Sequence, residues 1–120
     1  MKTYEDLEVF RRSHQFVLQV FKITNDIAKC KQLKFSLGDQ LVRSVISIPA
    51  NIAEGYGRYS KREKIRFLYI SRGSVEETKY YLLLLKDIKL ISEQKYKELS
   101  IEIEQIAKML NNLISYFKSS

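Results

Sequence analysis

The chain has 120 residues, of which 45% are hydrophobic and 29% charged, and its formal net charge is +7. This composition is that of an ordinary globular protein and excludes a disordered chain, while the length favours a single domain over residues 1–120.

The single cysteine, Cys30, excludes an intrachain disulfide and a cysteine-rich metal site. The opening MKTYEDLEVF carries acidic residues where a signal peptide has a basic and then an apolar region. No apolar run approaches the roughly 20 residues that a membrane span requires. We therefore expect a cytoplasmic protein without a membrane segment.

The excess positive charge lies in the first part of the chain. Residues 1–75 contain 14 Lys and Arg against seven Asp and Glu, whereas residues 76–120 contain seven of each. A one-sided positive charge favours a polyanionic partner, with nucleic acid as the first choice. The alternative is that the charge only keeps a small protein soluble.

Four segments repeat apolar residues with the helical period, and the first runs from about Tyr4 to Lys29. Its two apolar stripes, roughly 130° apart, are Leu7, Phe10, His14, Val17 and Phe21, and Val9, Phe16, Val20, Ile23 and Ile27. Because one stripe suffices for a monomeric bundle, this helix is expected to be deeply buried or to contact a second partner. His14 is interpreted as a hydrogen-bonded core or interface residue rather than a base.

The second helix is predicted from about Leu37 to Glu54, after the break CKQLKFS at residues 30–36. Its stripes are Leu41, Val45, Ile48 and Ile52, and Val42, Ile46, Pro49 and Ala53, so it is also expected to be mostly buried. Pro49 removes the hydrogen bond to the Val45 carbonyl, and a hydroxyl such as that of Ser47 could compensate part of this loss. We interpret the proline as a bend in the bundle, with a functional site as the alternative.

The third helix is predicted to begin with a capping box, Ser60-Lys-Arg-Glu63, and to run to about Leu90. Gly55 before it is expected to form a left-handed C-cap, with Gly57 giving the turn further freedom. One face of the third helix comprises Ile65, Leu68, Val75 and Leu82, and another Phe67, Ser71, Ser74, Thr78, Tyr81 and Leu85. The small residues of the second face predict the close approach of a neighbouring helix.

Ser92 is expected to cap the fourth helix. A heptad seam follows it: Tyr96, Leu99, Ile103, Ile106, Leu110, Leu113 and Phe117. Four helices with short connections and no strand pattern predict an all-α fold, an up-down antiparallel four-helix bundle.

The segment between the second and third helices is the candidate binding site. Five of the nine residues from Arg58 to Arg66 are basic and one is acidic. Basic side chains neutralise phosphates, and tyrosine rings stack on unpaired bases. The candidate nucleic-acid-binding residues are Tyr56, Arg58, Tyr59, Lys61, Arg62, Lys64 and Arg66. The alternative is a solvated first helical turn, although cations at a helix N-terminus oppose the helix dipole.

The polar strip of the second helix is expected to form a structural network. Arg43, Asn51 and Glu54, together with Arg72, could form buried ion pairs that fix helix register. Arg72 and Glu76 could also pair along one helix. A binding site is the alternative, and the strip could lie within one chain or at a subunit boundary.

Catalytic constellations are absent from the sequence. His14 is the only histidine, no Glu-x-x-His pair or phosphate-binding loop occurs, and Cys30 has no strong basic cluster beside it. We expect neither an enzymatic activity nor a cofactor or metal ion.

Four stretches carry a resemblance to a known family: DLEVF at residues 6–10, QLVRS at 40–44, SIPANIAEGYGR at 47–58, and RFLYISRGS at 66–74 followed by Glu77. Over nearly its whole length the chain resembles the bacterial 23S rRNA intervening-sequence proteins, also called the S23 ribosomal protein family. Ile88-Lys-Leu-Ile91 departs from the Leu-Gly-Tyr-Ile-type turn that this family often has there.

The resemblance implies a four-helix bundle that assembles as a homopentamer. It also implies kinship with the accessory protein of diversity-generating retroelements, a basic pentameric barrel that binds nucleic acid and a reverse transcriptase. It implies no catalytic residue.

Two functions are therefore expected as alternatives. The first is a non-enzymatic homo-oligomer that binds nucleic acid, with RNA as the expected form, through phosphate contacts. The second is a structural adaptor for a protein partner, such as a polymerase or a ribosome-assembly factor, because the first two helices carry excess apolar surface.

Overall fold

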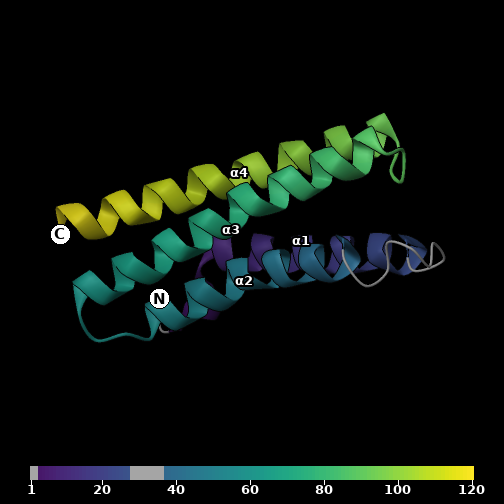
Figure 1. The fold of residues 1–120 in the computed structure, drawn as a ribbon. Helices are drawn as coiled ribbons and strands as arrows, with labels where there is room; N and C mark the ends of the chain where they lie inside the picture. Colours follow the sequence, from purple (N-terminus) through teal and green to yellow (C-terminus); the bar gives the residue numbers. More distant parts are fainter. Residues whose placement is uncertain (1–2, 28–36) are drawn as a thin grey trace.

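A computed structural model describes residues 3–27 and 37–120. Its elements in chain order are a 3-10 turn η1 (Tyr4–Asp6) and the helices α1 (Glu8–Ile27), α2 (Asp39–Tyr56), α3 (Lys61–Asp87) and α4 (Glu93–Ser119). Successive helices run in opposite directions and form an elongated bundle of 47 × 24 × 20 Å (Figure 1). The predicted all-α four-helix bundle is confirmed. Lys29, Cys30 and the predicted break at residues 30–36 lie outside the described residues.

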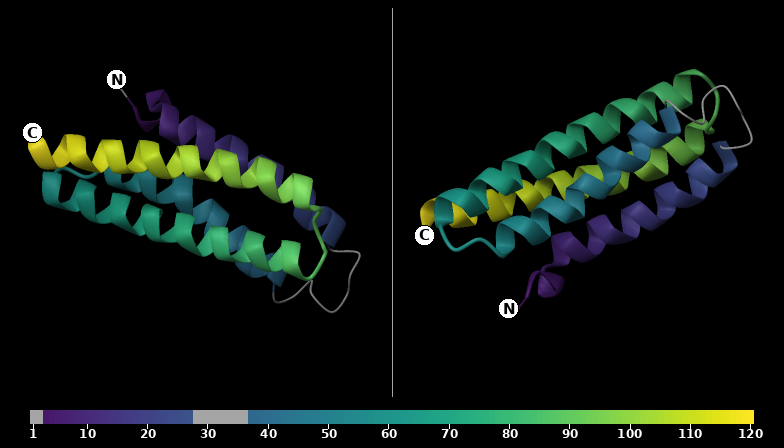
Figure 2. Two further views of the ribbon diagram at one scale, coloured as in Figure 1. Left: turned by 90° about the horizontal axis from the view of Figure 1, so that it is seen from above. Right: turned by 60° about the horizontal axis from the view of Figure 1, so that its bottom comes forward.

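The two short connections lie at opposite ends of the bundle. The α2–α3 connection lies at the end that also holds η1 and the last turn of α4 (Figure 2). The α3–α4 connection lies at the other end. Any function of the α2–α3 corner is therefore confined to one end of the molecule.

The core follows the bundle axis. α2 and α4 bury mainly one predicted stripe each, whereas α1 and α3 bury residues from both of theirs. The main stripe of α2, Leu41, Val45, Ile48 and Ile52, is fully buried. From the heptad seam of α4, Leu99, Ile103, Ile106 and Leu110 are buried, while Tyr96, Leu113 and Phe117 are half-buried. The seam therefore packs fully at its centre and less tightly near its ends.

The predicted serine caps begin α3 and α4. The Ser60 hydroxyl accepts a hydrogen bond from the Glu63 amide at 3.1 Å, and the Ser92 hydroxyl accepts one from the Lys95 amide at 3.0 Å. The reciprocal half of the predicted capping box is not formed at α3, because the Glu63 carboxylate pairs with Arg66 instead. Each serine still satisfies an amide that has no partner within its helix.

The small residues of α3 bring it into close contact with α2, as predicted. The Ser71 hydroxyl donates to the Ile48 carbonyl at 2.8 Å, and the Thr78 hydroxyl donates to the Ser44 hydroxyl at 2.9 Å. The Ser47 and Ser74 hydroxyl oxygens lie 2.7 Å apart. These bonds join α2 and α3 along their length and satisfy hydroxyls that would otherwise be buried without partners.

Gly55 supports the same close contact, and its predicted left-handed C-cap is wrong. α2 continues through Gly55 and ends at Gly57, which has a right-handed helical φ of −79°. A Cβ atom at Gly55 would lie 2.9 Å from Phe67 Cβ and 3.1 Å from the Lys64 carbonyl oxygen. Glycine is needed here because the backbone of α3 approaches too closely for a side chain.

Pro49 lies inside α2, which continues beyond it to Tyr56. The Ser47 hydroxyl does not compensate for the lost bond to the Val45 carbonyl, so this expectation is wrong. The hydroxyl bonds instead to the Ser74 hydroxyl on α3 and to the Asn51 side-chain amide one turn later on α2. Pro49 is buried at the α1–α2 contact and lines a groove between these two helices.

Parts of the Leu7–Phe21 stripe of α1 and of the Val42–Ala53 stripe of α2 form an exposed apolar surface. Phe21 and Ile46 are each 41% exposed. The expectation that α2 is mostly buried is therefore wrong on this side. α1, which was expected to be deeply buried or to contact a second partner, is not deeply buried here. His14 is exposed rather than in the core, and its ring stacks on Phe10 with centroids 6.3 Å apart. A shallow groove of about 300 Å³ lies between the two helices on this side. We call the residues that line it the outer α1–α2 face: Tyr4, Phe10, His14, Val17, Ile46, Pro49, Ala50 and Ala53.

Candidate nucleic-acid interface

The seven candidate residues lie in the connection between α2 and α3 and in the helical turns on either side of it. The connection consists of residues 57–60, with Ser60 as the N-cap of α3. The structure brings all seven to one end of the bundle and divides them into three groups by what they contact.

Tyr56 and Lys64 belong to the packing of the bundle. Tyr56 is half-buried against the core, and Lys64 Nζ donates to its carbonyl oxygen at 2.7 Å. Lys64 Nζ also lies 5.2 Å from the centroid of the Tyr56 ring and 5.9 Å from that of Phe117. A cation bonded to a carbonyl in the last turn of α2 stabilises the negative end of that helix. Both residues therefore have partners within the bundle.

Arg58 and Arg66 form ion pairs with neighbouring carboxylates. Arg58 pairs with Glu54 one turn earlier in the chain. Arg66 donates from Nε and Nη2 to the two Glu63 oxygens, at 3.0 and 3.2 Å. The hydrogen bond from Arg66 lowers the pKa of Glu63 below its ordinary value.

Both guanidinium groups also lie near one aromatic ring. The Cζ atom of Arg58 lies 4.6 Å from the centroid of the Phe67 ring, and that of Arg66 lies 4.5 Å from it. Each arginine thus has a carboxylate and a ring as partners, which reduces its availability for phosphate.

Tyr59, Lys61 and Arg62 form the remaining group, which we call the corner cluster. The Tyr59 side chain is completely exposed. Arg62 is exposed and forms no salt bridge within residues 3–27 and 37–120. Lys61 Nζ donates to the Ser120 carbonyl oxygen. Tyr59 and Arg62 are thus exposed without a salt bridge among the described residues, whereas Lys61 is exposed and bonded to a carbonyl at the end of α4.

Within one chain, Arg43, Asn51, Glu54 and Arg72 do not form the predicted network with one another. Arg43 is exposed, and Glu54 pairs with Arg58. Asn51 Nδ2 donates to both the carbonyl and the hydroxyl of Ser47, at 2.8 Å each.

Arg72 points instead toward α4. Its Nη1 donates to Asn111 Oδ1 at 3.1 Å, and its Cζ lies 4.6 Å from the centroid of the Tyr69 ring. Glu76, its expected partner, pairs with Lys79. The polar residues that do hold α2 against α3 are the small hydroxyls described above, which the spacing of serines and threonine on α3 had indicated.

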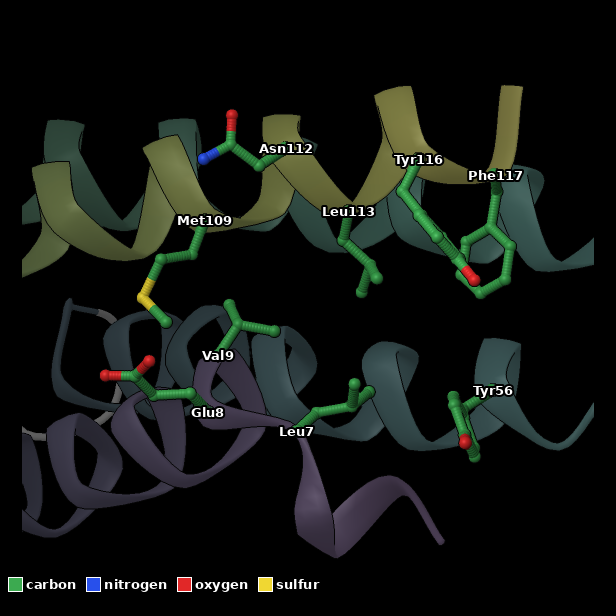
Figure 3. Close-up of a pocket in the computed structure, with 9 residues that line it drawn as sticks. All are labelled: Leu7, Glu8, Val9, Tyr56, Met109, Asn112, Leu113, Tyr116 and Phe117. Atoms are coloured by element: carbon green, nitrogen blue, oxygen red, sulfur yellow. The ribbon is translucent and has the colours of Figure 1, made fainter. Parts of the chain in front are cut away.

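A second concave feature, the terminal groove, was not indicated by the sequence. It has a volume of about 740 Å³ and lies between the start of α1 and the ends of α2 and α4. Figure 3 shows Met109, Leu113 and Phe117 of α4 extending toward Leu7 and Val9 of α1 and toward Tyr56. The half-buried residues at the end of the α4 seam were the available signal.

The terminal groove is lined by few ionisable side chains. Glu8 is its one ionisable carboxylate, and apolar and aromatic side chains make up most of its wall. Beside it, Arg12 links α1 to α4 through two bonds to the Glu102 carboxylate, at 3.1 and 3.2 Å. No group of His, Cys, Asp and Glu suited to a metal ion occurs in the described part of the chain. None of the described helices is both long and apolar enough to cross a membrane.

The fold and sequence are similar to those of known proteins. Residues 5–112 match the family described as 23S rRNA-intervening sequence protein. A protein of unknown function from the S23 ribosomal protein family of Bacteroides thetaiotaomicron is 28% identical to this chain in sequence. Its crystal structure superposes on this chain with a TM-score of 0.83. The similarity covers 89% of this chain and 95% of that one. No curated protein matches the chain.

Proposed function

The chain belongs to the family of 23S rRNA-intervening sequence proteins, and we propose that it is a non-enzymatic homo-oligomer that binds nucleic acid, with RNA as the expected form. The corner cluster supplies the contacts in this proposal. The observation that carries it is that Tyr59 and Arg62 are exposed at the corner while the surrounding cations are paired.

The charge of the chain supports a polyanionic ligand. The net charge of +7 arises from residues 1–75, which include the whole corner. Lys and Arg side chains bind nucleic acid by displacing counterions from phosphates, which requires no base sequence. A cation at the first turn of a helix opposes the helix dipole, so Lys61 and Arg62 do not stabilise α3 by their position. Phosphate binding gives these charges a role that folding does not.

Self-association would multiply these contacts. Ile46 on the outer α1–α2 face and Phe21 of α1 are each 41% exposed. A second copy covering this face would remove the apolar surface from water. Each copy would bring its own corner, so weak phosphate contacts would add through avidity. The resemblance described above points to a pentamer as the assembly to test.

A salt-dependent titration tests the binding proposal. Fluorescence anisotropy of a labelled RNA should show binding at low salt that weakens steeply as salt rises. Arg62→Ala should weaken binding and reduce the salt slope by about one per contacting copy. Lys97→Ala, which removes an exposed cation from the start of α4 at the other end, is the matched control and should bind as the wild type does. Absence of binding at low salt, or equal loss in both variants, would contradict the proposal.

The assembly is tested separately by light scattering. We expect a mass of several chains, and Ile46→Glu on the outer α1–α2 face should reduce it toward one chain. Ile101→Glu is the control, because Ile101 is 66% exposed on α4 and lies outside that face. A wild-type mass of one chain would remove the oligomer from the proposal and leave the corner to act alone.

The alternative function is an adaptor for a protein partner, favoured by the same exposed apolar face. Capture of partners from cells with and without nuclease separates the two. A partner retained after nuclease treatment would favour the adaptor, whereas one lost on treatment would favour a bridge made by nucleic acid.

A further inference from the structure

Tyr59 has an exposure unlike that of any other large apolar side chain in the described residues. Its exposed fraction is 103%, whereas the other exposed members of this class range from 37% to 66%. A ring in full contact with water contributes nothing to the hydrophobic stabilisation of the fold. Its neighbour Tyr56 shows the opposite behaviour, because it packs against the core. The corner therefore uses one tyrosine for folding and presents the other to solvent.

The cations nearest to Tyr59 in the chain are also unequal. Arg58 pairs with Glu54 and lies over the Phe67 ring. Lys61 and Arg62 are the first two residues of α3 and follow Tyr59 in the chain by two and three positions. Arg62 has an exposed guanidinium and no salt bridge in the part of the chain that the structure describes. An exposed ring followed closely in the chain by basic side chains suits a nucleotide, because the ring can stack on the flat base and a cation can bind the phosphate.

From this arrangement we infer that the corner cluster binds unpaired nucleotides, with the Tyr59 ring stacked on a base and Lys61 and Arg62 on the adjoining phosphates. The inference rests on the proposed function and names its ligand as single-stranded RNA. In a duplex both faces of each internal base are covered by its neighbours, so a side chain cannot stack without opening the helix. Stacking tolerates any sequence, because every base has a π face.

The chain contains no tryptophan, so a single introduced tryptophan can report on stacking by its fluorescence alone. Tyr59→Trp places one indole at the corner, and its fluorescence should be quenched when single-stranded RNA stacks on it. Tyr80→Trp is the matched control, because Tyr80 is 58% exposed on α3 and far from the corner. Its fluorescence should not change. An abasic strand with the same number of phosphates should quench neither variant.

Affinity measurements give a second readout. Tyr59→Ala should weaken binding to single-stranded RNA about tenfold or more, in line with the loss of one stacked base. It should leave binding to a duplex of equal length unchanged. Tyr59→Phe keeps the ring and should bind like the wild type, whereas Arg62→Ala should weaken binding to both ligands.

The outcomes separate this inference from the proposed function. If no nucleic acid binds, the proposed function fails and the inference fails with it. If RNA binds but Tyr59→Ala has no effect and Tyr59→Trp is not quenched, only the stacking inference is overturned. Light scattering of Tyr59→Ala provides one further test. A lower mass than the wild type would show that the ring contacts another copy of the chain, which would also overturn it.

Discussion

The two short connections of the bundle join antiparallel helices in different ways. Between α3 and α4, the Leu90 amide donates to the Leu85 carbonyl at 2.9 Å and the Lys89 amide to the Lys86 carbonyl at 3.0 Å. With Lys89 at a positive φ of 64°, these bonds form a Schellman motif. The α2–α3 connection contains no residue with positive φ and exposes Arg58, Tyr59 and Ser60.

This difference separates residues that serve folding from residues that do not. Leu90 and Ile91 pack against the core, and the backbone bonds of the Schellman motif close the end of α3. At the α2–α3 corner, the Gly57 and Arg58 amides close the end of α2 by donating to the Ala53 and Gly55 carbonyls, and the Ser60 hydroxyl caps α3. The exposed side chains of Tyr59 and Arg62 add nothing to either helix end, which is why we assign them to binding.

The largest expected effect concerns the glycine beside the α2–α3 connection. Gly55→Ala would force the added methyl group against Phe67 and the Lys64 carbonyl, and we expect a loss of about 1–3 kcal/mol in the free energy of unfolding. Gly73→Ala is the control, because a Cβ atom there meets nothing within 4 Å. It should stabilise α3 by about 0.5–1 kcal/mol. Urea denaturation measures both, and a stabilising Gly55→Ala would contradict the close-contact account.

Leu90 of the α3–α4 connection should contribute more to the free energy of unfolding than Tyr59 of the α2–α3 connection. Leu90→Ala removes a half-buried side chain from the core and should cost about 1–2 kcal/mol. Tyr59→Ala removes a larger side chain but should change the free energy of unfolding by less than about 0.5 kcal/mol. A large loss of stability in Tyr59→Ala would show that the ring serves the fold, against our assignment.

Lys89 allows a stabilising substitution at the α3–α4 connection. A non-glycine residue in the left-handed region is strained, and Lys89 has a φ of 64°. Lys89→Gly relieves the strain but gives the unfolded chain more freedom, so the expected net gain is about 0.5–1 kcal/mol. Lys97→Gly inside α4 should instead cost about 1 kcal/mol. Equal losses in the two variants would mean that Lys89 is not strained.

The smallest expected effect is a pH dependence at the start of α3. Arg66 lowers the pKa of Glu63 in the folded protein, so the unfolded state binds the proton more tightly. The stability from this pair is present above the unfolded pKa and is lost as the pH falls through the folded pKa. Urea midpoints of the wild type and Glu63→Gln should therefore differ slightly at pH 7 and converge toward pH 3. A difference that stays constant over this range would exclude the linkage.

The sequence predicted the helices and their contacts better than the roles of single residues. The small residues at positions 71, 74 and 78 predicted the close α2–α3 contact, since side-chain size is a local property. Gly55 was assigned to the wrong role because glycine serves both positive φ and close approach, and the sequence does not separate the two uses.

The polar partners were predicted less well. Arg43, Asn51, Glu54 and Arg72 were grouped together, but each side chain reaches a different neighbour that depends on how the helices are rotated. For the corner, the sequence identified seven candidates and could not rank them. Only the folded geometry shows that Arg58 and Arg66 share the Phe67 ring while Tyr59 is free of packing.

The most direct test of the account compares the affinity of one single-stranded RNA for three proteins at low salt. They are the wild type, a corner variant (Tyr59→Ala, Lys61→Ala, Arg62→Ala) and a control variant with the same net charge (Tyr80→Ala, Lys97→Ala, Lys108→Ala). We predict that the corner variant loses most of the binding and that the control variant keeps it. Equal affinities for the two variants would contradict the assignment of binding to the corner.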